Sequence, residues 1–162
     1  MMPNVTKAYN FQAILEGALS FLPGGVWLLS RKGTGGTTSA RYCYTVWLRH
    51  LIKTAPFRKG PPTGTVVELG PGDSLGIGLA ALLSGAERYV AVDSVRYADT
   101  QRNIEVLGEL VALFRQRAPV PDAREFPRVK PELQDYRFPD HLLPKAWLYK
   151  ALDPGRIQRI ES

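Results

Sequence analysis

The stretch Thr65-Val-Val-Glu-Leu-Gly-Pro-Gly-Asp-Ser-Leu-Gly76 decides the fold of this 162-residue chain. It begins with an apolar run of strand length and continues into a turn, rich in glycine, that opens onto a helix. A second apolar run, Arg88-Tyr-Val-Ala-Val-Asp93, comes after the helical residues and ends on a carboxylate. Strand, helix and strand predict a βαβ unit, and therefore an α/β fold with a parallel sheet.

The flanking sequence divides into regions of different character. Apolar residues recur at helical spacing over about 8–22, 40–53 and 100–117, and a linker rich in Pro and Gly covers 56–64. Seven prolines fall between 119 and 154, and residues 141–159 have only broken helical character. We therefore expect a helical N-terminal section at 1–60, a ligand-binding core at 61–118 and a Pro-rich, irregular or helical segment at 119–162.

Composition sets the class of protein. The chain is 44% hydrophobic and 22% charged, which is ordinary for a globular domain. Its single cysteine, Cys43, excludes an internal disulfide and a cysteine-based metal cluster, and it favours a reducing compartment such as the cytoplasm. The apolar stretch Phe21–Leu29 is interrupted by Pro23 and is too short to span a bilayer. We expect no transmembrane segment and no metal site.

The net charge of +6 is concentrated near the N-terminus, where residues 1–60 hold eight basic residues and one acid. A basic surface attracts phosphates, nucleotide sugars, anionic lipids or nucleic acid, although a solvated basic face needs no partner. No nucleic-acid-binding motif accompanies the charge, so we do not expect nucleic acid as a partner.

The glycine turn is typical of sites where a backbone approaches a nucleotide at the edge of a parallel sheet. A dinucleotide fingerprint requires its third glycine three residues after the second, whereas here Gly72 and Gly76 are four apart. Glu68 also places a negative charge beside the turn, which favours a ligand that is part cation and part nucleoside. An NAD-dependent oxidoreductase would also use an acid at the position of Asp93, but the glycine spacing disfavours that function.

These residues carry a family resemblance. Val-Val-Glu-Leu-Gly-Pro-Gly-Asp-Ser-Leu-Gly followed by Tyr-Val-Ala-Val-Asp resembles motifs I and II of the class I, Rossmann-like S-adenosylmethionine-dependent methyltransferases. More narrowly, Ala40-Arg-Tyr-Cys-Tyr-Thr-Val-Trp-Leu-Arg-His50 together with the turn resembles methyltransferases encoded near bacterial surface-polysaccharide genes. The resemblance implies S-adenosylmethionine as cofactor and a small-molecule or saccharide acceptor, such as a sugar or nucleotide sugar.

The resemblance also implies roles for particular residues. Glu68 would lie near the methionine part of the cofactor, and Gly70, Pro71 and Gly72 would form the turn beneath it. Asp93 would accept hydrogen bonds from both ribose hydroxyls, a bidentate role that suits a carboxylate.

Other candidate positions carry two interpretations each. Asp73 and Ser74 either bind the ligand or cap the following helix, while Ser94 and Val95 would flank the adenine. Arg41 and Tyr42 are candidates for substrate contact from the helix at 40–53. The alternative is that Tyr42 packs and that the basic stripe of this helix, which also includes Arg49 and Lys53, is solvated.

The resemblance covers only the first part of such an enzyme. Its family builds about seven strands, and only two are legible here, so we expect a Rossmann-like sheet that is incomplete after its N-terminal half. A truncated gene product, a fragment, or a partner chain that completes the sheet would account for this, and no residue is predicted as catalytic. The competing hypothesis is a catalytically silent module that binds a nucleoside or docks another chain.

Overall fold

The computed structural model describes residue 18 and residues 36–94 and 96–162. The chain divides into a unit of residues 1–33 and a unit of residues 34–162, and the second unit contains the glycine turn. The helix predicted over 8–22 lies outside the described residues except for Ala18, which is helical.

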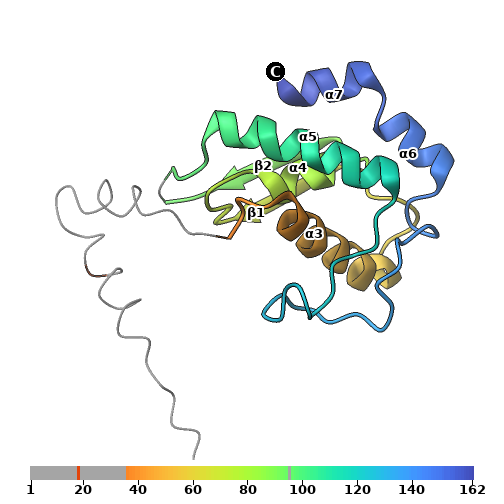
Figure 1. Ribbon diagram of the computed structural model, residues 1–162. Helices are drawn as coiled ribbons and strands as arrows, with labels where there is room; N and C mark the ends of the chain where they lie inside the picture. Colours follow the sequence, from red (N-terminus) through yellow and green to blue (C-terminus); the bar gives the residue numbers. More distant parts are fainter. Residues whose placement is uncertain (1–17, 19–35, 95) are drawn as a thin grey trace, which may run out of the picture. The chain divides into compact units, whose positions relative to one another are not determined.

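The second unit alternates helices and strands along the chain (Figure 1). Its elements are α3 (Ala40–Thr54), a short 3-10 turn η1 (Ala55–Phe57), β1 (Thr65–Leu69), α4 (Gly76–Leu83), β2 (Arg88–Val92), α5 (Thr100–Gln116), α6 (Lys145–Ala151) and α7 (Pro154–Glu161). The predicted βαβ unit and the helices on either side of it are therefore confirmed. The predicted broken helix near the C-terminus is the pair α6 and α7.

The sheet of the described residues has two parallel strands, with Val66 beside Tyr89 and Glu68 beside Ala91. Helix α4 contacts both strands, and α3 and α5 pack against α4 and against each other. Helices α3 and α5 therefore pack against α4, the crossover helix of one βαβ unit, which gives a small α/β arrangement.

Local sequence explains where the longer helices begin. The Ser39 side chain accepts a hydrogen bond from the Tyr42 amide at the start of α3, and Asp99 accepts one from the Arg102 amide at the start of α5. Helix α5 ends at Gln116, and the residue that caps it, Arg117, has a left-handed conformation with a φ of 49°. The apolar faces of α3, α4 and α5 meet in one core, where Tyr44 contacts Phe114 edge to face at 5.0 Å.

The long connection between α5 and α6 is held by side chains of α3. The Thr45 hydroxyl donates to the Pro121 carbonyl at 2.7 Å, and the Arg49 guanidinium donates to the carbonyls of Pro121 and Val129. Arg49 has no exposed surface and also lies 5.2 Å from the centre of the Tyr136 ring. The interpretation of Arg49 as part of a solvated basic stripe is wrong, because its charge satisfies carbonyls of a segment that has no strand or helix to pair them.

One face of the sheet is apolar and open to solvent. Val67, Leu69, Val90 and Val92 are between 39% and 79% exposed, whereas the opposite face, with Tyr89, lies toward α4. Parallel sheets are normally buried on both faces, so this surface is unusual. Among the described residues, no helix has the length and apolar character needed to cross a membrane.

Candidate functional site

The glycine turn lies where β1 ends. Gly70 and Gly72 have φ values of 71° and 76°, a left-handed conformation that side chains disfavour. The Gly70 amide donates to the Val92 carbonyl at 2.8 Å, which extends the pairing of the two strands by one bond. The turn therefore begins at the carboxyl ends of both strands, the usual place for a ligand in an α/β sheet.

The third glycine of the turn serves packing. A Cβ on Gly76 would lie 2.9 Å from Val106 Cγ1 and 3.0 Å from Ser74 Oγ, and it would overlap Cys43 Sγ. Gly78, two residues further along α4, has the Tyr89 ring against its backbone. The four-residue step from Gly72 to Gly76 thus places a residue without a side chain where α3 and α5 both approach α4.

A cavity of about 270 Å³ lies beside the turn, slightly smaller than the usual range for small-molecule sites. It brings together the turn, the end of β2, the loop after it and the first turns of α5. Its lining residues are Pro71, Gly72, Leu75, Ala91, Asp93, Arg96, Tyr97, Ala98, Thr100 and Asn103.

Some of the predicted site residues line this cavity, and so do residues that were not predicted. Pro71, Gly72 and Asp93, which come from two separate motifs, line the same space. Sequence reasoning missed Asn103, whose side-chain oxygen accepts a hydrogen bond from the Leu75 amide at 2.8 Å and so fixes α5 against the turn. Asp99 caps the first turn of α5, so the cavity lies beside a helix N-terminus, where partial positive charge favours anions and hydroxyl oxygens. An Asp directly before a helical pattern is the sequence signal that could have located this N-terminus.

Glu68 does not line this cavity. Its carboxylate accepts a hydrogen bond of 2.5 Å from the Tyr89 hydroxyl on the helix-covered face of the sheet. Burial raises the pKa of Glu68 above its ordinary value, and the bond from Tyr89 opposes that rise. Burial and the neighbouring carboxylate both raise the pKa of Tyr89, so the phenol remains a donor.

Asp73 and Ser74 are buried. The Ser74 amide donates to the Thr37 hydroxyl at 2.9 Å, and the Ser74 hydroxyl donates to the Thr37 carbonyl and accepts from the Gly76 amide. Ser74 therefore joins the turn to the residues before α3 and satisfies an amide in the first turn of α4. Ser94 is exposed beyond β2, and Val95 lies outside the described residues.

The two candidates for substrate contact face the connection between α5 and α6. Arg41 forms a bidentate ion pair with Glu125, with both N to O distances 2.6 Å, and neither Arg41 nor Tyr42 lines the cavity at the turn. The hydrogen bond from Arg41 lowers the pKa of Glu125. The Tyr42 ring contacts Phe126 edge to face at 5.7 Å, as the packing interpretation expects.

Metal ligation finds no support in the part of the chain that the structure describes, where no three His, Cys, Asp or Glu side chains gather. Comparison with protein-family models, with curated proteins and with solved structures finds no match to this chain. The resemblance to methyltransferases therefore stays a prediction from the residues themselves.

Proposed function

We propose that the cavity beside the glycine turn binds S-adenosylmethionine and that the chain is the cofactor-binding half of a methyltransferase. One observation carries the proposal: Gly72 and Asp93, predicted from separate motifs, line the same cavity at the carboxyl ends of two parallel strands. A glycine backbone and a carboxylate that line one cavity suit a nucleoside with an attached amino acid.

The residues of the cavity fit such a ligand. The Asp93 carboxylate lines the cavity and is the group that would accept hydrogen bonds from a ribose diol, and Tyr97 and Ala98 supply apolar surface for a base. Glu68 is bonded to Tyr89 and does not line the cavity, so its negative charge would act on a cationic ligand only through space. The bound cofactor would supply the methyl group, and the protein would align an acceptor with it.

Asp93→Asn tests the site directly by calorimetric titration with S-adenosylmethionine. Loss of a charged acceptor of two hydrogen bonds weakens binding by about tenfold or more. Asp135→Asn is the matched control, because Asp135 is an exposed carboxylate paired with Arg137 and does not line the cavity.

Three ligands distinguish the candidate functions in the same assay. S-adenosylmethionine and its demethylated product bind, and NAD does not, if the cofactor assignment is right. Binding of NAD alone would instead favour the oxidoreductase hypothesis, and failure of all three with a folded protein would end the cofactor proposal.

The acceptor and the cellular compartment are proposed on narrower grounds. A sugar or nucleotide sugar follows from the resemblance to polysaccharide-associated methyltransferases alone. The single, buried Cys43 favours a reducing compartment, for which we propose the cytoplasm.

A second function, docking of another chain, is favoured by the exposed sheet face. Leu69 is 79% exposed and Val67 62% exposed on a surface that parallel sheets normally bury. We propose that a partner chain completes the sheet and covers this face. A second copy is the simplest partner to test by sedimentation, where Val67→Lys with Val90→Lys should abolish concentration-dependent association.

Phe57→Lys is the control for that measurement, since Phe57 is 88% exposed but lies in η1 rather than in the sheet. A wild-type chain that stays monomeric at every concentration would contradict docking of a second copy.

A further inference from the structure

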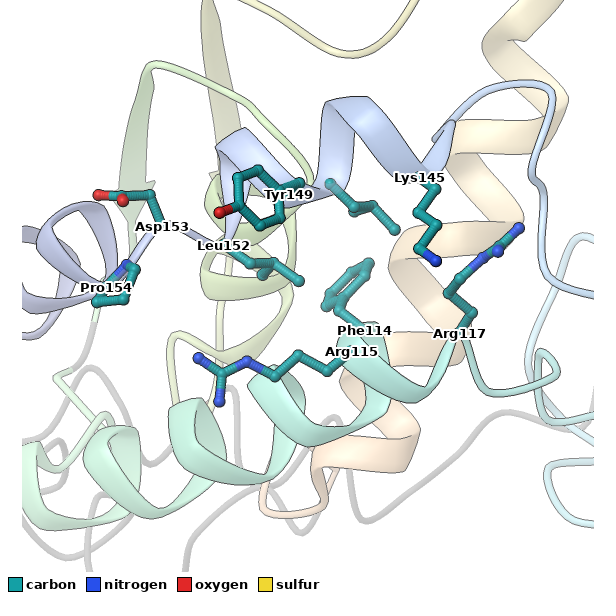
Figure 2. A pocket seen from close by; sticks show the side chains of 9 residues that line it. Phe114, Arg115, Arg117, Lys145, Tyr149, Leu152, Asp153 and Pro154 are labelled. Carbon is teal, nitrogen blue, oxygen red and sulfur yellow. The ribbon is translucent and has the colours of Figure 1, made fainter.

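A second cavity lies between the end of α5 and the last two helices (Figure 2). It has a volume of about 390 Å³, which is within the range of small-molecule sites. Its lining residues are Phe114, Arg115, Arg117, Lys145, Leu148, Tyr149, Leu152, Asp153 and Pro154.

The floor of this cavity is apolar. Phe114, Leu148 and Leu152 are buried, with exposed fractions of 0%, 4% and 8%. Tyr149 stands at the rim and is 85% exposed, although it is a large aromatic side chain. An apolar floor with an exposed aromatic ring beside it offers a surface on which the body of an aromatic or aliphatic molecule can lie.

The rim of the cavity is basic. Figure 2 shows Lys145 and Arg117 at one end and Asp153 and Pro154 at the other, with Phe114 and Leu152 between them. Arg117 is paired with Asp140, but the side chains of Arg115 and Lys145 form no hydrogen bond or ion pair with any other residue that the structure describes. Asp153 accepts a hydrogen bond from the Arg156 amide, so part of its acceptor capacity is engaged in capping α7. The cavity therefore offers cations to a ligand and has one carboxylate, at the far end from Lys145.

This cavity is separate from the one at the glycine turn. The two lie toward opposite ends of α5, where Asn103 lines the first and Phe114 lines the second. At 1.5 Å per residue, these two positions are about 16 Å apart along the helix axis. A ligand in the second cavity would not contact Asp93 or the turn.

We propose that this second cavity is a binding site for a small amphipathic anion, a molecule with an aromatic or aliphatic body and one carboxylate, sulfate or phosphate group. The body lies on Phe114, Leu148 and Leu152 with Tyr149 against it. The anionic group pairs with Lys145, whose ammonium has no competing partner among the described residues.

Calorimetric titration of the full chain with 2-naphthyl phosphate tests the proposal. We expect saturable binding that weakens about tenfold in Lys145→Ala and about fivefold in Tyr149→Ala. Lys150→Ala is the matched control, because Lys150 is an exposed lysine on the same helix that does not line the cavity, and its affinity should equal that of the wild type. Both lysines lie at the surface, so neither substitution removes a buried side chain.

Ligands that carry only one half of 2-naphthyl phosphate test whether the anionic group and the aromatic body both contribute to binding. Inorganic phosphate and 2-naphthol should each bind at least about tenfold more weakly than 2-naphthyl phosphate, since each lacks one half of the recognition. Saturating S-adenosylmethionine should leave the affinity unchanged, because the two cavities are at opposite ends of α5.

Three results would overturn the proposal. The first is absence of saturable binding up to about 1 mM. The second is binding that Lys145→Ala and Lys150→Ala weaken equally. The third is binding only to phosphatidylcholine vesicles that contain phosphatidic acid, with loss in Lys145→Ala, which would make the basic rim a lipid contact instead.

Discussion

Gly78→Ala should destabilise the protein even though alanine is the better helix former. Gly78 lies inside α4, and an added Cβ would overlap the ring of Tyr89, which the hydrogen bond to Glu68 holds in place. Overpacking of this kind costs about 1–3 kcal/mol, and displacement of the ring also weakens a hydrogen bond to a charged group. Alanine regains about 1 kcal/mol of helix propensity. We expect a net loss of about 2 kcal/mol in the free energy of unfolding.

Urea unfolding followed by circular dichroism measures this loss, with Gly108→Ala as the matched control. Gly108 is also inside a helix, but apart from the backbone of its own helix and its chain neighbours no atom lies within 4 Å of the position its Cβ would occupy, so alanine there should stabilise by up to about 1 kcal/mol. The mechanism requires coupling to the ring: in a Tyr89→Ala background, Gly78→Ala should lose most of its cost. An equal cost in both backgrounds would refute the role of Tyr89.

Three further predictions concern buried polar groups. Arg49→Leu should cost about 3 kcal/mol because it leaves buried carbonyls of the 117–144 connection without donors, whereas Arg41→Leu, which breaks an exposed ion pair, should cost less than about 1 kcal/mol by the same urea assay. Burial raises the pKa of Cys43 from 9.0 to about 12, so iodoacetamide at pH 8 should modify the thiol only after unfolding. The pKa of Cys43 is higher in the folded than in the unfolded protein, so the contribution of this thiol to stability is complete below pH 9.0 and is lost as the pH rises toward 12. A free energy of unfolding that does not fall with pH in this range would contradict the burial of the thiol. Tyr89→Phe removes the bond that opposes the effect of burial, so the pKa of Glu68 should rise further in an NMR titration, and the free energy of unfolding should fall more steeply as the pH rises above 4.5; an unchanged titration would show that the bond is absent in solution.

The local elements of the fold were predictable because their signals are local. The apolar run at 65–69, the glycine turn and the apolar helix after it are all read within a few residues, and the structure has them where they were predicted. The candidate site was predictable to the same extent, since Pro71, Gly72 and Asp93 lie at the ends of those elements and line one cavity.

The positions that sequence reasoning assigned least well depend on distant partners. Arg49 lies on a helix face that looks solvated from its spacing, yet it is buried against carbonyls 72 and 80 residues away. Asn103 bonds to an amide 28 residues before it, and no pattern near it indicates that role. Such residues carry no periodic signal, because their burial is decided by a segment that has no regular structure of its own.

By itself the sequence determined one βαβ unit, a glycine turn and a carboxylate at the end of the second strand, because strand and helix periods and glycine conformations are properties of short segments. Only the tertiary structure decided which charges are exposed. In the folded protein Glu68 is bonded to Tyr89 and does not line the cavity at the turn, Arg49 is buried, and Lys145 lies at the rim of a second cavity. The physical reason is that desolvation and hydrogen-bond partners come from neighbours in space, which a linear pattern does not contain.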